Sequence, residues 1–382
     1  MPDWSLTLHA SIHEIDSELW NRCAGPDNPF VRHGFLSALE ESGSVGPHTG
    51  WLPRHAVLHA DGQPVAMAPL YGKGHSYGEY VFDHAWANAY EQAGGRYYPK
   101  LQSAVPFSPV PGPRLLIHPD YPAPEAAAQA LGQAIAQACG ELELSSVHAT
   151  FCTRDDQFHL VRNGWLPRLG LQYHWHNRGY ADFEHFLAAL SSRKRKSIRR
   201  ERRDAQNCGL TFHTKRGLDI TAADWEAFYR FYLSTIDRKW GSAYLTARFF
   251  PLLCERLGDR IVLMLAEHEG KPVAAALNIL GKDTLYGRNW GCEGEWPFLH
   301  FELCYYRAID FAIEHSLSRV EAGAQGEHKI QRGYLPKLTY SAHYLRDPNL
   351  RSAVADFLDQ ERAAIHEEKE ALGEFSPYRT EE

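Results

Sequence analysis

The sequence lacks any long, unbroken apolar segment. Its apolar runs, such as Ile261–Ala266, are interrupted by proline, glycine or charge and fall well short of the roughly 20 residues that cross a bilayer. We therefore predict that no membrane span is present. Residues 1–18 carry several acidic side chains and have no basic start followed by an apolar core, so they do not resemble a signal peptide. The expected compartment is the cytoplasm.

An excess of positive charge is missing as well. Lys and Arg number 40 against 47 Asp and Glu, which gives a formal net charge of −7. A protein that binds nucleic acid over its whole surface carries an excess of basic residues, so the net charge argues against this class. A local basic patch stays compatible with the total.

Paired cysteines are also absent. The seven cysteines are odd in number and include no Cys-x-x-Cys spacing, so the sequence indicates neither a disulfide framework nor a thiolate zinc site. His174 and His176 alternate along an expected strand and face the same side, as two metal ligands would, but the sequence offers no third ligand. We expect structural histidines there and no metal.

The composition is otherwise that of a folded protein. Hydrophobic residues make up 44% of the 382-residue chain and aromatic residues 12%, which excludes a largely disordered or low-complexity protein. At about 150 residues per domain, the length favours two or three domains. We expect two, because the chain contains a repeat.

The first repeated pattern is a β-hairpin. Asp61 aligns with Glu269, an offset of 269 − 61 = 208 residues. In each copy an apolar strand, Ala56–Leu58 or Ile261–Ala266, meets an acidic residue and a glycine, and a strand of small apolar residues follows. An acidic-Gly pair between two such strands is typical of a tight hairpin turn.

The second repeated pattern is Gly-aromatic-Leu-Pro-basic-Leu, at Gly164–Leu169 and at Gly333–Leu338, an offset of 333 − 164 = 169 residues. Because the two offsets differ by 208 − 169 = 39, we place an insertion of that length within about residues 80–124. We therefore predict two domains, residues 1–190 with this inserted loop and residues 191–382. Between the two patterns we expect helices at Ala126–Gly140 and His300–His315 and short strands at Ser146–Phe151 and Arg319–Ala322.

A basic helix is expected to open the second domain. Eight basic residues and one acidic residue lie between Arg193 and Arg203, the steepest charge gradient in the chain. Clustered Lys and Arg can bind a phosphate-rich ligand such as tRNA. Such a run is also typical of a solvated helix face whose arginines pair with acids of the same chain. The first interpretation assigns Arg199 and Arg200 to the phosphates of a donor.

Three segments resemble a known family: Ala104–Arg114, Ser191–Glu201 and Gly323–Lys329. They are similar to segments of bacterial Fem-like N-acyltransferases, also described as peptidoglycan biosynthesis and recognition proteins, and the resemblance covers nearly the whole chain. The order of elements in each half resembles the GNAT acyltransferase fold. The resemblance implies an α/β (α+β) fold of tandem GNAT-like units, with mixed sheets flanked by helices. It also implies an N-acyltransferase that moves an acyl or aminoacyl group to the amine of a small-molecule or peptide-like acceptor, such as a peptidoglycan-type precursor.

The resemblance leaves the donor open between acyl-CoA and an aminoacyl-tRNA, and implies no tightly bound cofactor. GNAT enzymes bind acyl-CoA at a strand-to-helix turn, where backbone N–H groups hold the pyrophosphate. The turn that resembles it here, Arg288–Pro297, matches the family at Arg288 and Gly291, which we take as donor contacts. Glu293 and Glu295 would repel phosphate, which argues against a standard CoA site. A plain surface turn is the alternative.

The densest polar group follows an expected strand of the second half. Its members are Glu321, Gln325, Glu327, His328, Lys329 and Arg332. Acyl transfer to an amine needs a base and a donor that stabilises the oxyanion, and a carboxylate or His beside Lys or Arg supplies both. We assign Glu327 or His328 as the base, with Glu321 as a further catalytic candidate. Lys329 and Arg332 are assigned as oxyanion or carboxylate binders, and Gln325 as an acceptor contact. A salt-bridged helix start is the alternative.

The inserted loop is rich in aromatic residues, with a few charged ones among them. Aromatic walls suit a cationic or sugar-containing acceptor, and they suit the packed core of a lid equally well. We select Tyr80, Trp86 and Tyr98 as walls of an acceptor site.

Two rival functions stay open. A degenerate transferase would bind a cell-wall or nucleotide-linked precursor without turning it over, and the acidic donor turn favours this class. An RNA-binding module would use Arg193–Arg203, and a steep fall of its affinity with salt would identify it. The residues do not indicate an oligomeric state.

Overall fold

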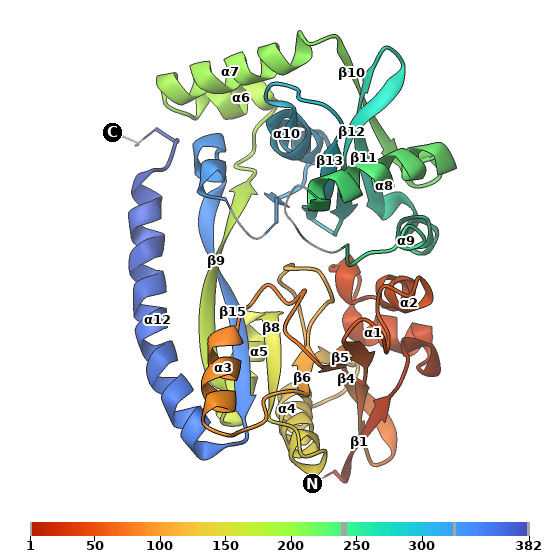
Figure 1. Ribbon diagram of the computed structural model, residues 1–382, viewed down its shortest axis with the longest axis vertical. Helices are drawn as coiled ribbons and strands as arrows, with labels where there is room; N and C mark the ends of the chain where they lie inside the picture. The colour runs from red at the N-terminus through yellow and green to blue at the C-terminus, as the bar shows by residue number, and fades with distance from the viewer. Residues whose placement is uncertain (1, 238–242, 324–325, 380–382) are drawn as a thin grey trace. The chain divides into compact units, whose positions relative to one another are not determined.

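The structure is a computed structural model that describes residues 2–237, 243–323 and 326–379 (Figure 1). The chain divides into two compact units. Unit 1 comprises Met1–Gly170 and Leu338–Glu367, and unit 2 comprises Leu171–Lys337 and Glu368–Glu382. Among the described residues, no helix is both long enough and apolar enough to cross a bilayer.

Unit 1 contains two groups of paired strands and the helices that pack on them. One group has the order β1-β3-β4-β7, with β1 at Trp4–His9, β3 at His55–Ala60, β4 at Gln63–Ala68 and β7 at Leu116–Ile117. The other has the order β15-β8-β6-β5-β2, with β15 at Leu335–Leu345, β8 at Ser146–Cys152, β6 at Lys100–Ser103, β5 at Leu70–Lys73 and β2 at Trp51–Pro53. The helices are α1 Ser17–Ala24, α2 His33–Glu41, α3 His84–Gln92, α4 Pro124–Glu141, α5 Arg154–Arg162, most of α12 Pro348–Glu374, and the short η1 Ile12–Glu14 and η2 Pro29–Val31.

Unit 2 is built on one run of six strands. Their order is β10-β11-β12-β13-β14-β9, with β10 at Leu210–Arg216, β11 at Ile261–His268, β12 at Lys271–Leu280, β13 at Thr284–Cys292, β14 at Arg319–Glu321 and β9 at Leu166–His176. The helices are α6 Phe183–Ala188, α7 Ser192–Gln206, α8 Ala222–Asp237, α9 Phe249–Leu257, α10 Leu299–Phe301, the π-helical η5 Glu302–Tyr306, α11 Arg307–Glu314, and the 3-10 helices η3 Gly217–Asp219, η4 Gly258–Arg260 and η6 Glu327–Arg332.

Both predicted hairpins are confirmed. Strands β3 and β4 are antiparallel neighbours, as are β11 and β12. The turn residues Asp61 and Gly62 have φ values of 49° and 78°, and Glu269 and Gly270 have 52° and 73°. Two consecutive positive φ angles match the right-handed twist of the flanking strands, and an acidic-Gly pair tolerates them, so the local sequence is sufficient to determine this turn.

The last strand of each half lies in the unit built mainly by the other half. The C-terminal part of β9, from the first half, pairs with β14 in unit 2, and β15, from the second half, pairs with β8 in unit 1. The compact units therefore differ from the predicted domains, residues 1–190 and 191–382. The division into compact units does not test the proposed repeat boundary or the insertion at about residues 80–124, so both stay predictions.

Each unit has its own core. In unit 1, the apolar face of α4 packs against β3, β4 and β8, where Leu131 and Ile135 are buried. In unit 2, α11 packs its apolar face on β13 and β14, with Ile309 and Ala312 fully buried. Strand β11 lies between two other strands, and its residues from Ile261 to Ala266 are all apolar and buried on both faces.

Candidate functional site

In unit 2, strands β13 and β14 separate, and a cavity lies where they do. They pair in parallel only between Thr284–Tyr286 and Arg319–Glu321, after which β13 continues and β14 ends. Where pairing stops, the backbone N–H and C=O groups along the continuing edge of β13 need other partners. A cavity of about 70 Å³ opens there, lined by Ala276, Leu277, Asn278, Gly287, Arg288, Asn289, Trp290, His300, Cys304, Tyr305 and Ala322.

One wall of this cavity is aromatic. The ring centroids of Trp290 and His300 are 4.6 Å apart, and those of His300 and Tyr305 are 5.3 Å apart. The helix that carries His300 and Tyr305 contains the π-helical turn η5 between α10 and α11. Such turns occur mostly as single insertions in α-helices and are frequent at functional sites. The sequence analysis did not identify these aromatic residues as part of a site, because hydrophobic periodicity alone assigns them to the core.

Helix η6 brings two of the predicted catalytic residues close to the cavity. Tyr305, which lines the cavity, places its hydroxyl 2.9 Å from His328 Nε2. The pKa of His328 is lowered, first by burial and then by the charges of Arg332 and Lys329. Gly326 precedes the helix at φ 119°, where a Cβ would lie 2.5 Å from the His328 ring, so glycine is required at this entry.

Lys329 is a buried amine. Only 2% of it is exposed, and its Nζ donates a hydrogen bond to the carbonyl of Gly323 at 3.1 Å. Burial lowers its pKa to about 8, and the thiol of Cys304 opposes this shift. Because Cys304 lines the cavity, Lys329 lies near the cavity wall. An amine with this pKa can exchange a proton close to neutral pH.

Glu321 is a buried carboxylate at the end of β14. Burial raises its pKa to about 7, although Arg319 contacts its Oε1 at 3.2 Å. Its Oε2 has no hydrogen-bond partner among the described residues and lies 3.9 Å from His174 Nε2. Burial followed by Arg319 lowers the pKa of His174 to about 3, so this imidazole is neutral. Glu321 itself does not line the cavity, whereas the next residue, Ala322, does.

The remaining residues of the predicted polar group have different surroundings. Glu327 is exposed at the start of η6, and Gln325 lies outside the described residues. Arg332 is buried and donates to the carbonyl of His328 and to Glu201, both at 2.9 Å. The helix that carries His328 and Arg332, η6, is a 3-10 helix.

The predicted donor contacts on the basic segment lie on α7, which is a helix as expected. Arg199 is ion-paired with Glu184, and Arg200 with Asp204 at 3.4 Å. All four side chains are exposed or nearly so, and exposed pairs of this kind contribute little to stability. These pairs match the solvated-face interpretation and leave the phosphate contacts a prediction.

The predicted donor turn is wrong in its first half. Arg288 and Gly291 belong to strand β13, and the turn begins only at Glu293, which pairs with Arg230 at 3.3 Å. Gly291 has a packing reason of its own: a Cβ there would lie 1.9 Å from the carbonyl oxygen of Phe231 in α8. Arg288 lines the cavity, whereas Gly291 does not.

The predicted acceptor walls belong to unit 1. Trp86 is buried, with its ring 5.0 Å from that of His343. Tyr98 is half-buried and its hydroxyl lies 2.8 Å from Ser76 Oγ. Tyr80 is 37% exposed and adopts a φ of 61°, uncommon for a residue with a side chain. The three residues therefore differ in exposure, and their role stays a prediction.

A buried ionic cluster in unit 1 was not predicted. Lys100 is fully buried, and its Nζ donates to Ser76 Oγ and Glu79 Oε2, each at 2.8 Å, and to Asp83. Burial raises the pKa of Glu79 to about 7 and lowers that of Lys73 to about 7. Sequence gives little signal for this cluster, since buried and exposed lysines look alike in a single chain.

Unit 1 also has a parallel strand pair that separates, and there the gap is filled. Strands β6 and β8 pair only as far as Ser103 and Ala149. Beyond this point the fully buried guanidinium of Arg114 donates to the carbonyl of Thr150 at 3.0 Å and to carbonyls of its own loop. The carbonyl of β8 is therefore satisfied by a side chain.

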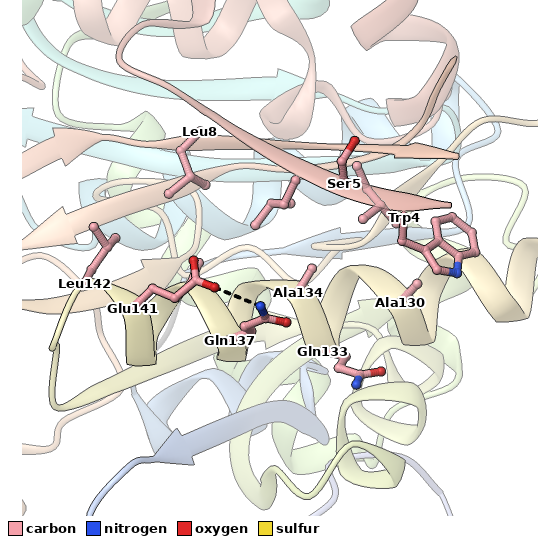
Figure 2. A pocket seen from close by; sticks show the side chains of 12 residues that line it. Trp4, Ser5, Leu8, Ala130, Gln133, Ala134, Gln137, Glu141 and Leu142 are labelled. Atoms are coloured by element: carbon pink, nitrogen blue, oxygen red, sulfur yellow. Dashed lines mark hydrogen bonds between the residues drawn. The ribbon is translucent and has the colours of Figure 1, made fainter. Parts of the chain in front are cut away.

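A groove of about 440 Å³ in unit 1 lies between the edge strand β1 and helix α4 (Figure 2). Its walls are mainly apolar, with a short polar row in which Gln137 donates to Glu141 at 2.8 Å. None of the predicted site residues lines it. Among the described residues that line it, none is basic, so these offer no cation to a phosphate or an oxyanion.

No group of three or more metal-binding side chains occurs in the part of the chain that is described. His174 and His176 lie with ring centroids 6.4 Å apart on β9. Both pKa values are lowered, mainly by burial.

The chain matches the FemAB-like family model, described as peptidoglycan biosynthesis/recognition, over residues 11–380. Three solved structures are similar. The first is the C-terminal domain of a putative lysylphosphatidylglycerol synthetase from Agrobacterium fabrum; the match covers 92% of this chain and 97% of that one, with 10% identity and a TM-score of 0.55. The second is the crystal structure of FemX; the match covers 92% of this chain and 100% of that one, with 12% identity and a TM-score of 0.54. The third is a tandem GNAT protein from the clavulanic acid biosynthesis pathway; the match covers 91% of this chain and 99% of that one, with 10% identity and a TM-score of 0.49.

Among curated proteins, none matches this chain. At these identities, the likeness to the first two structures shows the fold alone. The predicted fold class, tandem GNAT-like units with mixed sheets flanked by helices, is confirmed.

Proposed function

Because the chain belongs to the FemAB-like family, we propose that it is an N-acyltransferase that moves an acyl or aminoacyl group to the amine of a peptidoglycan-type precursor. The proposed site is the cavity beside β13 in unit 2. One observation carries this choice: β13 leaves β14 beside two buried groups, Lys329 and Glu321, whose pKa values of about 8 and about 7 lie near neutrality. Ordinary solvated side chains of these types titrate far from neutral pH.

The proposed chemistry uses Lys329 as the group that moves the proton. The acceptor ammonium gives a proton to neutral Lys329, and the free amine attacks the acyl carbonyl. The new C–N bond forms as the donor's C–O ester or C–S thioester bond breaks, and the leaving oxygen or sulfur receives the proton from Lys329. The attacking nitrogen then gives its second proton to the neutral Lys329, which releases it to solvent, so that a neutral amide remains. General acid–base help of this kind contributes about 10²–10⁴ in rate.

The oxyanion of the tetrahedral intermediate needs hydrogen-bond donors. Tyr305 and Asn289 line the cavity, and their hydroxyl and amide groups are the proposed donors. Glu321 is a second proton acceptor one residue from the lining residue Ala322. Arg332 is engaged by Glu201 and His328, so its proposed role changes from oxyanion binding to holding η6.

The donor is proposed to be acyl-CoA or an aminoacyl-tRNA. The exposed cations of α7, Arg199 and Arg200 among them, are the proposed contacts for donor phosphates. The exposed Glu293 and Glu295, in the turn between β13 and α10, disfavour pyrophosphate at that place and so favour the tRNA donor.

The same two acids favour a second candidate, a binding protein that recognises the precursor without turnover. Thermal unfolding with CoA, acyl-CoAs and a nucleotide-linked peptidoglycan precursor separates the two candidates when combined with a transfer assay. A ligand at about 100 times its Kd adds about 2.7 kcal/mol to stability. Stabilisation by the precursor, with no product from any donor, would favour the binding protein.

The transfer assay tests the proposal itself. The protein is incubated with the precursor and either acyl-CoAs or a pool of charged tRNA, and the precursor's mass is followed. We expect a mass increase of one acyl or aminoacyl group, and at least a 100-fold lower rate for Lys329→Met. The control is Lys337→Met, an exposed lysine in β15. Full activity of Lys329→Met would remove the assigned proton transfer.

A further inference from the structure

Helix α7 has two faces of different character. Four exposed cations, Arg193, Lys196, Arg200 and Arg203, recur at intervals of three and four residues along its outer side. The inner side carries the buried Ile198 and Ala205. Between these two lie Glu201 and Arg202, and Glu201 is the one acid of the run from 193 to 203. Its side chain is only 14% exposed, so the single acid of a basic helix is turned inward.

Arg202 fixes the inner face of α7 to the helix that forms the aromatic cavity wall. Its guanidinium donates to both carboxylate oxygens of Glu302, at 3.1 and 3.2 Å, and to Asp310 at 2.6 Å. Glu302 is fully buried and begins the π-helical turn η5. A forked guanidinium held by two carboxylates defines orientation as well as distance. The ion pairs of Arg202 therefore fix the backbone of α7 at the neighbouring residue, Glu201.

Glu201 connects η5 with η6. Its Oε2 accepts a hydrogen bond from the hydroxyl of Tyr306 in η5 and another from Arg332 Nη2 at 2.9 Å. Arg332 then donates through Nη1 to the carbonyl of His328 and lies 3.4 Å above the ring of Phe301. The carboxylate thus holds the guanidinium that holds the backbone of η6, and η6 carries Lys329.

We propose that Glu201 is a positioning residue, which acts through Arg332 to hold η6 so that Lys329 stays buried beside Cys304 at the cavity. The proposal rests on the proposed function only for the role of Lys329 in proton transfer. The connection between Glu201 and Lys329 is a geometric claim, and it is testable without any substrate.

The pH profile of Lys329 is the appropriate readout. The titratable groups that interact with its amine are Cys304 from η5, His174 from β9 and, on η6 itself, His328. If Glu201 is removed and η6 loosens, water reaches the amine and its pKa rises from about 8 towards the ordinary 10.5. Loss of a nearby negative charge alone would lower the pKa of an amine. The two explanations therefore predict shifts of opposite sign.

The experiment is competitive labelling with fluorodinitrobenzene over a range of pH, with the modification of Lys329 quantified by peptide mass spectrometry and normalised to its plateau. In the whole wild-type chain we expect a midpoint near pH 8. Glu201→Ala should raise it by about one pH unit or more. Glu201→Gln keeps an oxygen for Tyr306 and Arg332 and should restore most of the wild-type profile. Glu184→Ala, which removes the outer-face pair with Arg199, is the matched control and should change nothing.

An unchanged or lowered midpoint in Glu201→Ala would overturn the proposal, as would the same shift in Glu184→Ala. If Glu201→Ala fails to fold, Arg332→Lys takes its place, because it keeps a charge for Glu201 and loses the second hydrogen bond to His328. The same upward shift is expected, and its absence overturns the proposal equally. Failure of the proposed function is a separate result, namely full transfer activity in Lys329→Met.

Discussion

Replacing Gly291 by Ala tests why glycine stands at this position of β13. A Cβ there would lie 1.9 Å from the carbonyl oxygen of Phe231 and 2.3 Å from its carbonyl carbon. Real Cβ atoms do not approach backbone atoms so closely, and the obstacle is backbone rather than a flexible side chain, so α8 or β13 must move. Forcing extra volume into a packed interior costs about 1–3 kcal/mol, occasionally more. We expect Gly291→Ala to destabilise unit 2 by at least that amount.

Thermal unfolding measures the effect, and about 1–3 kcal/mol corresponds to about 2–12 °C for a unit of this size. Gly373→Ala in α12 is the control, since nothing lies within 4 Å of the added Cβ and a helical alanine is favoured over glycine. If Gly291 served a donor phosphate instead, its alanine variant would keep wild-type stability and lose donor binding. That pair of results would refute the packing argument.

Three further predictions concern buried charges. Lys100→Met should lower the free energy of unfolding by about 3–5 kcal/mol, because Glu79 and Asp83 lose the buried ammonium between them; a loss below about 1 kcal/mol in urea unfolding would contradict this. As the pH rises from 8 to 10.5, the free energy of unfolding of the wild type should increase relative to that of Lys329→Met. In this range the unfolded state keeps a proton on Lys329 that the folded state has released. A difference between the two proteins that stays constant with pH would argue against the lowered pKa. For Glu321 the change of stability with pH has the opposite sign, because the folded state keeps a proton that the unfolded state has released. Wild type should therefore lose stability relative to Glu321→Gln as the pH rises from 4.5 to 7. Thermal unfolding at several pH values with no such loss would show the carboxylate to be solvated.

Local signals predicted the repeated elements well. The hairpins at Asp61 and Glu269 follow from acidic-Gly pairs that tolerate positive φ at consecutive positions. Gly164 and Gly333, the first residues of the second repeated pattern, also have positive φ, 82° and 90°, two residues before β9 and β15 begin. In each case the decisive interaction is within a few residues, so the sequence alone was sufficient.

Long-range packing accounts for what the sequence did not predict. Gly291 was assigned to a turn, but it is opposite Ala275 in the β12–β13 ladder, and a strand partner is not encoded locally. Glu201 and Arg332 are 131 residues apart, and nothing in a basic run indicates that its single acid points inward. The last strand of each half pairs inside the other unit, which a linear repeat cannot reveal.

The candidate site was predicted by residue type rather than by geometry. Lys329, His328 and Glu321 were selected because acyl transfer needs such groups, and the structure places all three in unit 2. The cavity wall of Trp290, His300 and Tyr305 was not selected, because aromatic residues at helical or strand spacing look like core.

The central claim is that the opening beside β13 in unit 2 binds the reacting groups. Hydrogen exchange followed by mass spectrometry, with the nucleotide-linked precursor and with acyl-CoA or charged tRNA added in turn, tests it most directly. The account predicts slower exchange at residues 287–290, the part of β13 that lines the cavity, and at residues 326–332, which include η6. Protection confined to the groove between β1 and α4, with unchanged exchange in unit 2, would contradict it.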